Sequence, residues 1–337
     1  MHILVTGCAG FIGFHLTRKL LSLGYRVTGV DNLNTYYDPE LKIARLHQLG
    51  VDAAGIPAYE TRRDPSGAFL FIRADVHSTR LYEAFLDDAR FDYVCHLAAQ
   101  AGVRYSLENP GQYVDSNVTG FFRLLEYCRR HPAKRLVFAG SSSVYGTDNV
   151  PPYAEDDCTD APVSLYAATK KSNELFAHCY ASLYGLEIVG LRFFTVYGPW
   201  GRPDMAPFLF TRAILEDRPL QVFNNGEMLR DFTYIDDVID ALCLTLFHEP
   251  DTVDKKRYRV YNVGCSSPVV LNDFVGILER ITGKVAHRIY RPMQPGDVRE
   301  TWADITLLQA HYHYAPRIRI QEGLPAFVRW YRTYYRY

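Results

Sequence analysis

Short apolar runs and amphipathic segments alternate along the first half of the chain. The runs are four or five residues long and rich in β-branched and aromatic side chains, which is typical of buried strands. They cover 2–5, 26–30, 69–73, 93–97, 135–138 and 187–191. The segments between them predict helices over 11–22, 40–48, 79–87, 113–130 and 165–184. This alternation predicts βαβ units, and hence an α/β fold with a parallel sheet and right-handed crossovers.

The second half of the chain differs from the first in composition and in the regularity of its predicted elements. After Gly198, Pro and Gly become frequent, and irregular segments separate predicted helices over 207–216, 235–247 and 272–282. We therefore expect one domain over 1–197 and a smaller lobe mainly over 198–337. Part of 231–264 is expected to return to the first domain. Residues 51–66, rich in Gly, Pro and charge, are expected to form a surface excursion without regular structure.

Composition excludes several classes of protein. A net charge of −1 gives no electrostatic reason to expect a nucleic-acid or membrane partner. The seven cysteines are scattered without a C-x-x-C pair, so we expect neither a disulfide framework nor a metal site. Met1 leads directly into an apolar strand, and no apolar run approaches the roughly 20 residues of a membrane helix. We therefore expect a soluble cytoplasmic protein.

A glycine-rich turn joins the first predicted strand to the first predicted helix. Gly7, Gly10 and Gly13 are spaced as G-x-x-G-x-x-G. The first glycine permits a tight turn, the second allows a pyrophosphate to approach the backbone, and the third lets helix and strand pack closely. The free N–H groups of the following helix attract an anion. In this context the motif predicts a dinucleotide site.

Asp31 indicates which dinucleotide is bound. It ends the second strand, 18 residues after Gly13, where a carboxylate accepts hydrogen bonds from both ribose hydroxyls and repels a 2′-phosphate. NAD is therefore favoured over NADP, although a plain turn would also explain Asp31. Asp75 is expected near the adenine, and small side chains at 97–100 leave room for the cofactor. The predicted cofactor contacts are Gly7, Gly10, Phe11, Ile12, Gly13, Asp31, Asn32, Asp75, Val76, Leu97, Ala98, Ala99, Gln100, Asn117, Tyr166 and Lys170.

Tyr166 and Lys170 are the candidate catalytic pair. They are four residues apart on a predicted helix and so share a face. The ammonium, together with the positive nicotinamide ring, would lower the pKa of the phenol and make it a base. Ser141, at the end of the fifth strand, completes the set as a hydroxyl relay. Tyr-x-x-x-Lys also arises by chance in a chain with 25 tyrosines. The catalytic assignment of the pair therefore depends on the glycine-rich dinucleotide turn upstream.

Six further segments carry a resemblance to a known family: 31–38, 96–106, 164–174, 191–206, 230–237 and 292–298. With them the chain resembles the extended short-chain dehydrogenase/reductase superfamily and, more narrowly, the UDP-glucuronate 4-epimerases. The resemblance implies a Rossmann-type doubly wound parallel sheet, tightly bound NAD regenerated in each turnover, and a smaller C-terminal lobe for a UDP-sugar. It also implies a homodimer formed through the helices at 113–130 and 165–184. The implied reaction is C4 oxidation, rotation of the 4-keto sugar and re-reduction without decarboxylation.

Three hydroxyl side chains separate this chain from sister enzymes. By the same resemblance, 4,6-dehydratases carry an acid pair where this chain has Ser142 and Ser143, and UDP-glucuronate decarboxylases carry a glutamate at the Ser143 position. UDP-galactose 4-epimerases typically carry asparagine at the Thr195 position. The hydroxyls therefore favour a UDP-glucuronate 4-epimerase, with a UDP-glucuronate decarboxylase or a UDP-glucose 4-epimerase as the alternatives. Local hydrogen bonds to the backbone would also explain them.

The expected substrate contacts extend into the second lobe. They are Arg104, Ser142, Ser143, Asn173, Thr195, Arg202, Gln221, Phe223, Arg230 and Arg299. Arg230 stands where the resemblance implies a contact to the UDP phosphates. Related enzymes often carry an arginine at the Gln294 position, so the second phosphate contact is left open.

The basic and aromatic segment 329–337 permits two interpretations. Stacking on aromatic rings and phosphate contacts would suit a nucleic acid. An amphipathic C-terminal helix packed on the small lobe is the favoured interpretation, and no nucleic-acid partner is expected.

Overall fold

The computed structural model describes residues 1–292 and 299–337. Its centre is an eight-stranded sheet in the order β11-β7-β6-β5-β1-β2-β4-β3. Adjacent strands are parallel except for β3, which runs antiparallel to β4. The strands are β1 (His2–Thr6), β2 (Arg26–Asp31), β3 (Glu60–Arg63), β4 (Phe69–Arg73), β5 (Tyr93–His96), β6 (Arg135–Ser141), β7 (Ile188–Phe193) and β11 (Tyr258–Val263).

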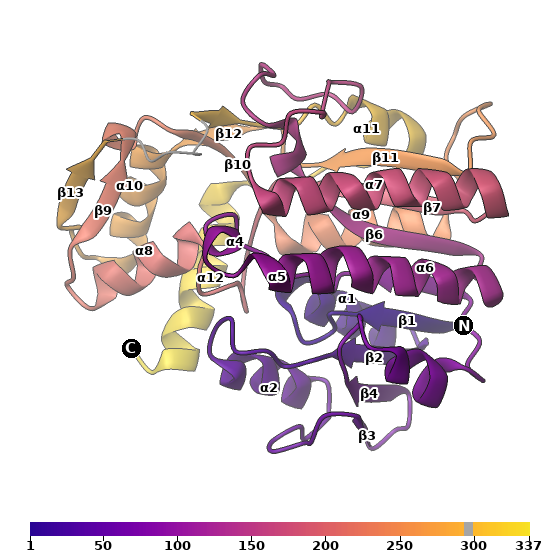
Figure 1. Cartoon of the computed structure of the whole chain (residues 1–337). Coiled ribbons are helices and arrows are strands. Elements are labelled where there is room, and N and C mark those ends of the chain that lie inside the picture. The colour runs from indigo at the N-terminus through magenta and orange to yellow at the C-terminus, as the bar shows by residue number, and fades with distance from the viewer. Residues whose placement is uncertain (293–298) are drawn as a thin grey trace.

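Helices cover both faces of this sheet, as expected for a doubly wound fold. In Figure 1, α6 (Gly120–Arg130) and α7 (Leu165–Tyr184) lie on the near face, and α1 (Phe11–Ser22) and α9 (Ile235–Phe247) lie on the far face. Successive side chains of β1 point to opposite sides of the sheet. Ile3 and Val5 therefore join the cluster that contains Phe14 of α1, whereas Leu4 joins the cluster that contains Phe121 of α6.

A second lobe adjoins the carboxyl ends of the central strands and lies at the left of Figure 1. In one of its sheets β10 pairs with β8, β12 and β14, and β9 pairs with β13 in another. Its elements are β8 (Thr195–Tyr197), α8 (Ala206–Leu215), β9 (Leu220–Phe223), β10 (Leu229–Tyr234), β12 (Pro268–Val270), α10 (Leu271–Thr282), β13 (Arg288–Arg291), β14 (Glu300–Thr301) and α12 (Ile320–Tyr335). α11 (Thr306–Tyr312) instead packs on β11 of the central sheet. Between α9 and α11, β11 returns to the central sheet beside β7.

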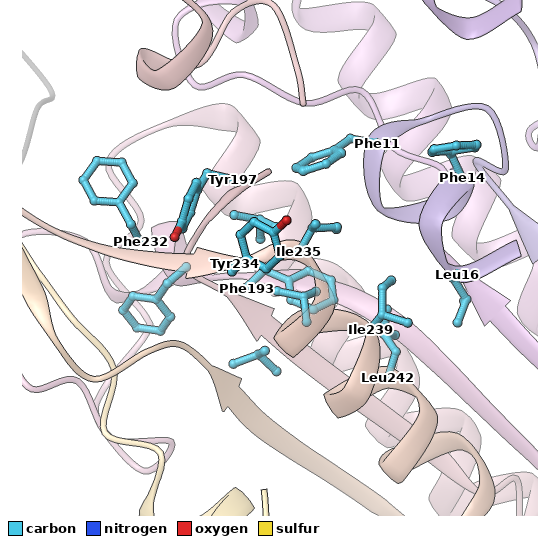
Figure 2. Close-up of a cluster of buried hydrophobic side chains, with 14 of the residues drawn as sticks. Phe11, Phe14, Leu16, Phe193, Tyr197, Phe232, Tyr234, Ile235, Ile239 and Leu242 are labelled. Atoms are coloured by element: carbon cyan, nitrogen blue, oxygen red, sulfur yellow. The ribbon is translucent and has the colours of Figure 1, made fainter. Parts of the chain in front are cut away.

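An apolar cluster connects the two parts of the chain. Figure 2 shows Phe11 of α1 on the side of Tyr197, Tyr234 and Ile235, while Phe14 lies farther along α1; all five belong to one buried cluster. Tyr197 and Tyr234 contact each other edge to face, with centroids 5.5 Å apart. Because this cluster is buried and continuous, it holds the cofactor turn and the second lobe in one packed body.

Shorter elements complete the chain. They are α2 (Pro39–Gln48), α3 (Thr79–Leu81), the π-helix η1 (Tyr82–Leu86), α4 (Tyr105–Glu108), α5 (Pro110–Tyr113), the π-helix η2 (Val114–Thr119) and the 3₁₀ turns η3 (Ser142–Tyr145) and η4 (Asn224–Gly226).

Most predicted elements coincide with observed ones, and the helices over 11–22, 165–184 and 235–247 match residue for residue. The helix predicted over 113–130 instead begins at Pro110 and passes through η2. The expectation that 51–66 lacks regular structure is wrong for Glu60–Arg63, which pairs with β4. All four residues of this edge strand are exposed and polar, so the sequence has no alternating apolar pattern there.

The C-terminal segment forms a helix packed on the second lobe, as favoured above. α12 continues to Tyr335, and the Tyr331 ring is buried against Phe208, with centroids 4.9 Å apart. In the described residues, no helix is both long and apolar enough to cross a membrane.

Candidate active site

The turn between β1 and α1 has the geometry that a pyrophosphate requires. Gly7 has a φ of +72°, and a Cβ atom on Gly13 would lie 2.0 Å from the carbonyl oxygen of Gly7. No side chain at this position could be accommodated without moving the turn. α1 begins at Phe11 without a side-chain cap, so its first N–H groups are left for a ligand. These residues fit the diphosphate of a dinucleotide.

Asp31 lies at the end of β2 and is held in place by its neighbours. One carboxylate oxygen accepts the N–H of Ala9 at 3.2 Å, and the other accepts the N–H of Leu33 at 2.9 Å. Lys42 Nζ of α2 forms a buried ion pair with Asp31 at 3.1 Å. Asn32 Nδ2 donates to Asp75 Oδ1 at 2.7 Å, which joins two further predicted cofactor contacts. The carboxylate therefore faces the cavity from a fixed position, as ribose recognition requires.

A cavity of about 390 Å³ runs along the carboxyl ends of the central strands. It is the position at which open parallel sheets bind their ligands. Every predicted cofactor contact except Asn117 lines it. Its lining also includes the predicted substrate contacts Ser142, Ser143, Thr195 and Arg202 and the predicted catalytic residues Ser141, Tyr166 and Lys170.

Asn117 lies behind the cavity wall and supports it. Its side chain accepts the N–H of Gln100 at 2.7 Å and donates to the carbonyl oxygen of Gln100 at 3.1 Å. It also donates to Thr169 Oγ1 on α7 at 3.0 Å. The fully buried amide therefore fixes the segment that follows β5 relative to the helix that carries Tyr166 and Lys170.

Tyr166 and Lys170 project from the first turns of α7. Ser164 caps this helix by accepting the N–H of Ala167 at 3.1 Å. Lys170 Nζ donates to the carbonyl oxygen of Ala139 at 2.8 Å and lies 5.9 Å from the centroid of the Tyr166 ring. Tyr166 is hydrogen-bonded to Ser141, the last residue of β6. The three predicted catalytic side chains therefore meet at one point of the cavity.

The pKa of Tyr166 is raised in the protein alone, whereas a lowered pKa is expected in the presence of the positive nicotinamide ring. Burial raises it above its usual value, and the Ser141 hydrogen bond and the Arg202 charge oppose that rise. Burial and the Arg202 charge lower the pKa of Lys170 to about 8. In the protein alone Arg202, and not Lys170, supplies the opposing charge, and the expected effect of Lys170 together with the nicotinamide ring stays a prediction.

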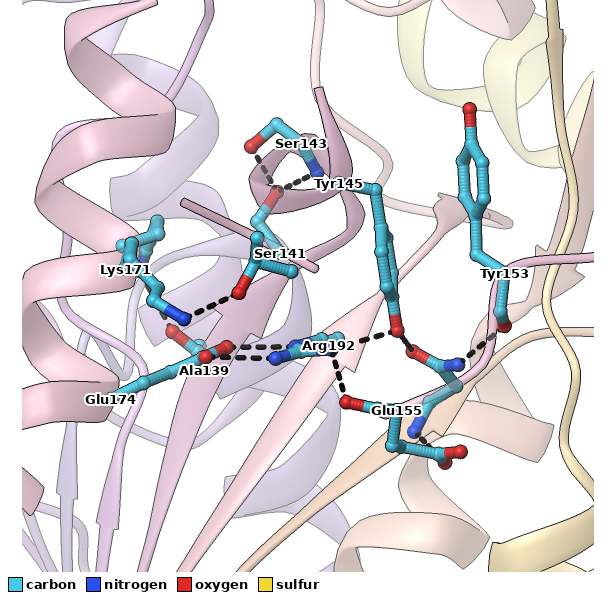
Figure 3. A network of polar contacts seen from close by, with 12 residues as sticks. Ala139, Ser141, Ser143, Tyr145, Tyr153, Glu155, Lys171, Glu174 and Arg192 are labelled. Atoms are coloured by element: carbon cyan, nitrogen blue, oxygen red, sulfur yellow. Dashed lines mark hydrogen bonds and ion pairs between the residues drawn. The ribbon is translucent and has the colours of Figure 1, made fainter. Parts of the chain in front are cut away.

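The serine turn after β6 links the catalytic hydroxyl to the two serines that follow it. Ser141 Oγ lies 2.8 Å from Ser143 Oγ and accepts the N–H of Ser143 at 3.3 Å. Figure 3 shows the polar network behind this turn. Arg192 binds both carboxylate oxygens of Glu174 on α7, at 2.8 and 2.9 Å, and donates to the Tyr145 hydroxyl at 2.9 Å. The network anchors both the serine turn and α7.

Arg202 brings a positive charge into the cavity from the segment between β8 and α8. It pairs with Asp204, whose Oδ2 also accepts the hydroxyl of Tyr36 at 2.9 Å. Burial would lower the pKa of Arg202, but the Asp204 carboxylate outweighs that effect and raises the pKa above its usual value. The arginine therefore remains cationic beside Tyr166 and suits an anionic group of a substrate.

The remaining predicted substrate contacts do not line the cavity. Arg104 stacks over the Phe223 ring at 5.6 Å, and Arg230 Nη1 donates to the carbonyl oxygen of Arg299 at 3.1 Å. Exposed Gln221 lies on β9 next to Phe223. Buried Asn173 has its amide against the carbonyl oxygens of Asn117 and Thr169, at 2.8 and 3.2 Å in the orientation that satisfies both. Gln294 lies outside the described residues.

Several cavity residues were missed in the sequence. Asn34, Tyr36, Tyr37 and Lys42 line the cavity, as does Met205 beside Arg202. The first three belong to segment 31–38, which carries the family resemblance, but nothing in the pattern assigned them a role. Lys42 looks like an ordinary solvent-facing lysine of an amphipathic helix, and only the packing of α2 brings it to Asp31.

The described part of the chain contains no candidate metal-binding site. No group of three or more His, Cys, Asp or Glu side chains there could hold a metal ion. The seven cysteines are all free thiols.

A doubly wound dinucleotide fold with Ser141, Tyr166 and Lys170 in its cavity defines an extended short-chain dehydrogenase/reductase. The chain belongs to the NAD dependent epimerase/dehydratase family, whose model matches residues 3–264. Protein CapI of Staphylococcus aureus is 45% identical, with 100% of both chains covered. UDP-glucuronate 4-epimerase 4 of Arabidopsis thaliana is 45% identical over 99% of this chain and 76% of its own length.

A similar solved structure is the UDP-glucuronic acid 4-epimerase of Bacillus cereus in complex with UDP-glucuronic acid and NAD. It is 35% identical to this chain, with a TM-score of 0.87 over 99% of this chain and 100% of that one.

Proposed function

We propose that this protein interconverts UDP-glucuronate and UDP-galacturonate with NAD as a bound, regenerated cofactor. The observation that carries the proposal is a cavity shared by Tyr166, Lys170 and the hydroxyls of Ser142, Ser143 and Thr195. The Arabidopsis and Bacillus relatives are named for this activity, and the Bacillus structure contains both ligands. NAD, when bound, accepts a hydride from C4 of the sugar and returns it to the opposite face.

Tyr166 is the proton acceptor and donor in this proposal. Its hydroxyl takes the proton of the C4 hydroxyl as oxidation proceeds and returns it on reduction. The Ser141 hydroxyl, bonded to Tyr166, holds the reacting oxygen and relays the proton. Lys170, anchored on Ala139, holds the nicotinamide ribose and adds positive charge beside the phenol. With Arg202 and the cationic nicotinamide ring nearby, the phenolate is more stable than burial alone would allow.

In this proposal the hydroxyls of Ser142, Ser143 and Thr195 bind the carboxylate of the sugar and set its orientation. Oxidation at C4 gives a β-keto acid, which loses carbon dioxide when the C5–C6 bond aligns with the carbonyl π system. Ser142, Ser143 and Thr195 are neutral donors that can hold the carboxylate out of that alignment without an acid nearby. Arg202 supplies a charge that balances the carboxylate.

The second lobe anchors the nucleotide in this proposal, so that the keto sugar can turn while UDP stays bound. Arg230 and Arg299 are the candidates for the diphosphate, and their proximity supports a common role. Arg104 and Phe223 are already stacked and, with Gln221 and Asn173, are the candidates for the rest of the nucleotide.

The two lobes have separate roles in this proposal. Residues 1–197, together with part of 231–264, bind the cofactor, and residues 198–337 mainly bind the nucleotide sugar. The pairing of β11 with β7 supports this division. The free thiols favour a reducing cytoplasm.

A homodimer through α6 and α7 completes the proposal. Phe122 of α6 and Leu175 and Leu183 of α7 are exposed apolar side chains on helices that pack against each other. Sedimentation or light scattering of the purified protein measures its mass directly. A monomer at micromolar concentration would contradict this part of the proposal.

The decisive test uses UDP-glucuronate with the purified protein and no added NAD. Chromatography of the nucleotide sugars should show UDP-galacturonate at equilibrium with UDP-glucuronate. A UDP-pentose as the main product would indicate the decarboxylase instead. Conversion of UDP-glucose but not UDP-glucuronate would indicate the UDP-glucose 4-epimerase.

A further inference from the structure

Arg45 of α2 lies at the meeting point of three segments that are distant in sequence. Its side chain is fully buried. Nη1 donates to the carbonyl oxygen of Ala9 in the glycine-rich turn at 2.9 Å. Nη2 donates to the carbonyl oxygens of Trp200 and Gly201, at 2.7 and 3.4 Å. One guanidinium group therefore joins the cofactor turn to the segment that leads into the second lobe.

The charge of Arg45 makes these contacts costly to break. In the described residues, no carboxylate forms an ion pair with it, and only carbonyl oxygens and the Tyr37 hydroxyl, at 2.8 Å, accept its hydrogen bonds. A buried cation that loses such acceptors keeps its desolvation penalty. The Ala9 and Trp200 carbonyls are therefore held together for as long as α2 is packed.

The segment 199–204, which we call the connector, is tied to the cofactor domain at two more points. His15 of α1 bonds the carbonyl oxygen of Pro199 through Nε2 at 2.9 Å. Burial lowers the pKa of His15 to about 3, so the ring is neutral and donates this hydrogen bond from Nε2. At the other end, Tyr36 bonds Asp204 at 2.9 Å. Arg202, which lines the cavity, lies between these two attachments.

We propose that Arg45 is a positioning residue that couples retention of the dinucleotide to the placement of Arg202. By holding Ala9, Arg45 fixes the turn that binds the pyrophosphate. By holding Trp200 and Gly201, it keeps the connector over the same end of the cavity and sets the position of the Arg202 guanidinium. This inference rests on the proposed function for the identity of the sugar, but its cofactor part is independent of the sugar.

The test compares Arg45→Met and Arg45→Lys with Arg257→Met as the control. Arg257 is exposed and pairs with Glu187 far from the cavity. Each protein is purified with its bound NAD and passed repeatedly through a desalting column. NAD is then quantified chromatographically after denaturation. Because hydrogen bonds to a charged group are lost, Arg45→Met should release NAD at least about tenfold faster than the wild type and the control. Arg45→Lys should lie between them.

Kinetics distinguish positioning from general damage. With saturating NAD added, Arg45→Met should recover only part of the wild-type kcat, because a misplaced Arg202 no longer stabilises the Tyr166 phenolate, and its KM for UDP-glucuronate should remain raised. Unchanged NAD release together with an unchanged KM would overturn the proposal. Full recovery of both kcat and KM on addition of NAD would also overturn it, because Arg202 would then be correctly placed without Arg45.

His15→Phe keeps the test decisive if Arg45→Met does not fold. The phenyl ring fills the buried site but cannot form the hydrogen bond to the Pro199 carbonyl. The connector therefore loses this attachment but keeps its hydrogen bonds to Arg45. Faster NAD release and a raised KM are expected, and wild-type values for both would contradict the proposal. If the wild type holds NAD but does not convert UDP-glucuronate, the proposed function fails, and the NAD-release comparison still decides the role of Arg45.

Discussion

Ser141 Oγ and Ser143 Oγ lie 2.8 Å apart in the turn after β6, beside the phenol of Tyr166. The hydroxyl assigned to proton relay is therefore bonded directly to a hydroxyl assigned to the substrate carboxylate. Oxidation at C4 and control of the C6 carboxylate consequently depend on one short turn. Its position is fixed from behind by Tyr145 and Arg192.

Changing these hydroxyls should change the product. Ser143→Glu places an acid where the carboxylate binds, and Thr195→Val removes a hydroxyl without changing the shape of the side chain. Both variants should release UDP-4-keto-pentose, because the carboxylate is free to adopt the orientation that loses carbon dioxide. Mass spectrometry of the products measures the ratio, with Thr195→Ser as the control that keeps a hydroxyl. A product ratio equal to that of the wild type in both variants would disprove the role assigned to the hydroxyls.

Removing the phenol hydroxyl should stop the chemistry and leave the cofactor bound. Tyr166→Phe keeps the ring in α7 but cannot transfer a proton, so kcat should fall by roughly 10²–10⁴. The NAD content of the purified variant should equal that of the wild type, because the hydroxyl contacts Ser141 and not the glycine turn. Turnover within tenfold of the wild type would show that another group acts as the base.

The buried Lys170 makes stability depend on pH in the alkaline range. Its pKa is lowered to about 8 in the folded protein, whereas an unfolded lysine titrates near pH ~10.4. Between these values the unfolded state binds more protons, so the free energy of unfolding rises with pH. Relative to Lys170→Met, the wild type should gain about 1 kcal/mol between pH 7 and pH 9. Urea unfolding at each pH measures this difference, and a loss of relative stability over this range would be inconsistent with a buried, desolvated lysine.

The ion pair of Asp31 and Lys42 should be tested as a pair. Asp31→Ala leaves a buried lysine without its partner and should cost about 3–5 kcal/mol of folding free energy. The double variant Asp31→Ala, Lys42→Met should recover part of that loss, since the stranded charge is removed. Both variants should bind NAD weakly by calorimetry because the ribose acceptor is gone. Full NAD affinity in the double variant would contradict the role of Asp31.

The sequence was sufficient for the architecture where local patterns carry the information. The glycine spacing after the first strand and the strict alternation of elements predicted the doubly wound sheet. Helix boundaries at Phe11 and Leu165 were visible because Gly10 and Ser164 immediately precede them. β3 was missed because its exposed charged residues lack the period of a half-buried strand.

Cavity residues could be predicted where a short spacing, a strand end or the family resemblance marks them, and not where packing alone brings them to the site. Tyr166 and Lys170 share a helix face, whereas Lys42 and Arg45 act on residues brought to them by packing. The direction of the Tyr166 pKa shift also depends on packing, because burial raises the pKa and outweighs the opposing effects of the Ser141 hydrogen bond and the Arg202 charge. The buried position of Asn173 follows from the contact between α7 and η2, which no local pattern encodes.

The return of the same hydride is the central claim, and isotope retention tests it most directly. UDP-glucuronate labelled with deuterium at C4 is incubated with the purified protein and no added NAD, and the products are examined by mass spectrometry. The account predicts UDP-galacturonate that keeps its deuterium at C4, because the hydride stays on the bound cofactor between the two steps. Loss of the label from UDP-galacturonate, or a pentose as the main product, would contradict it.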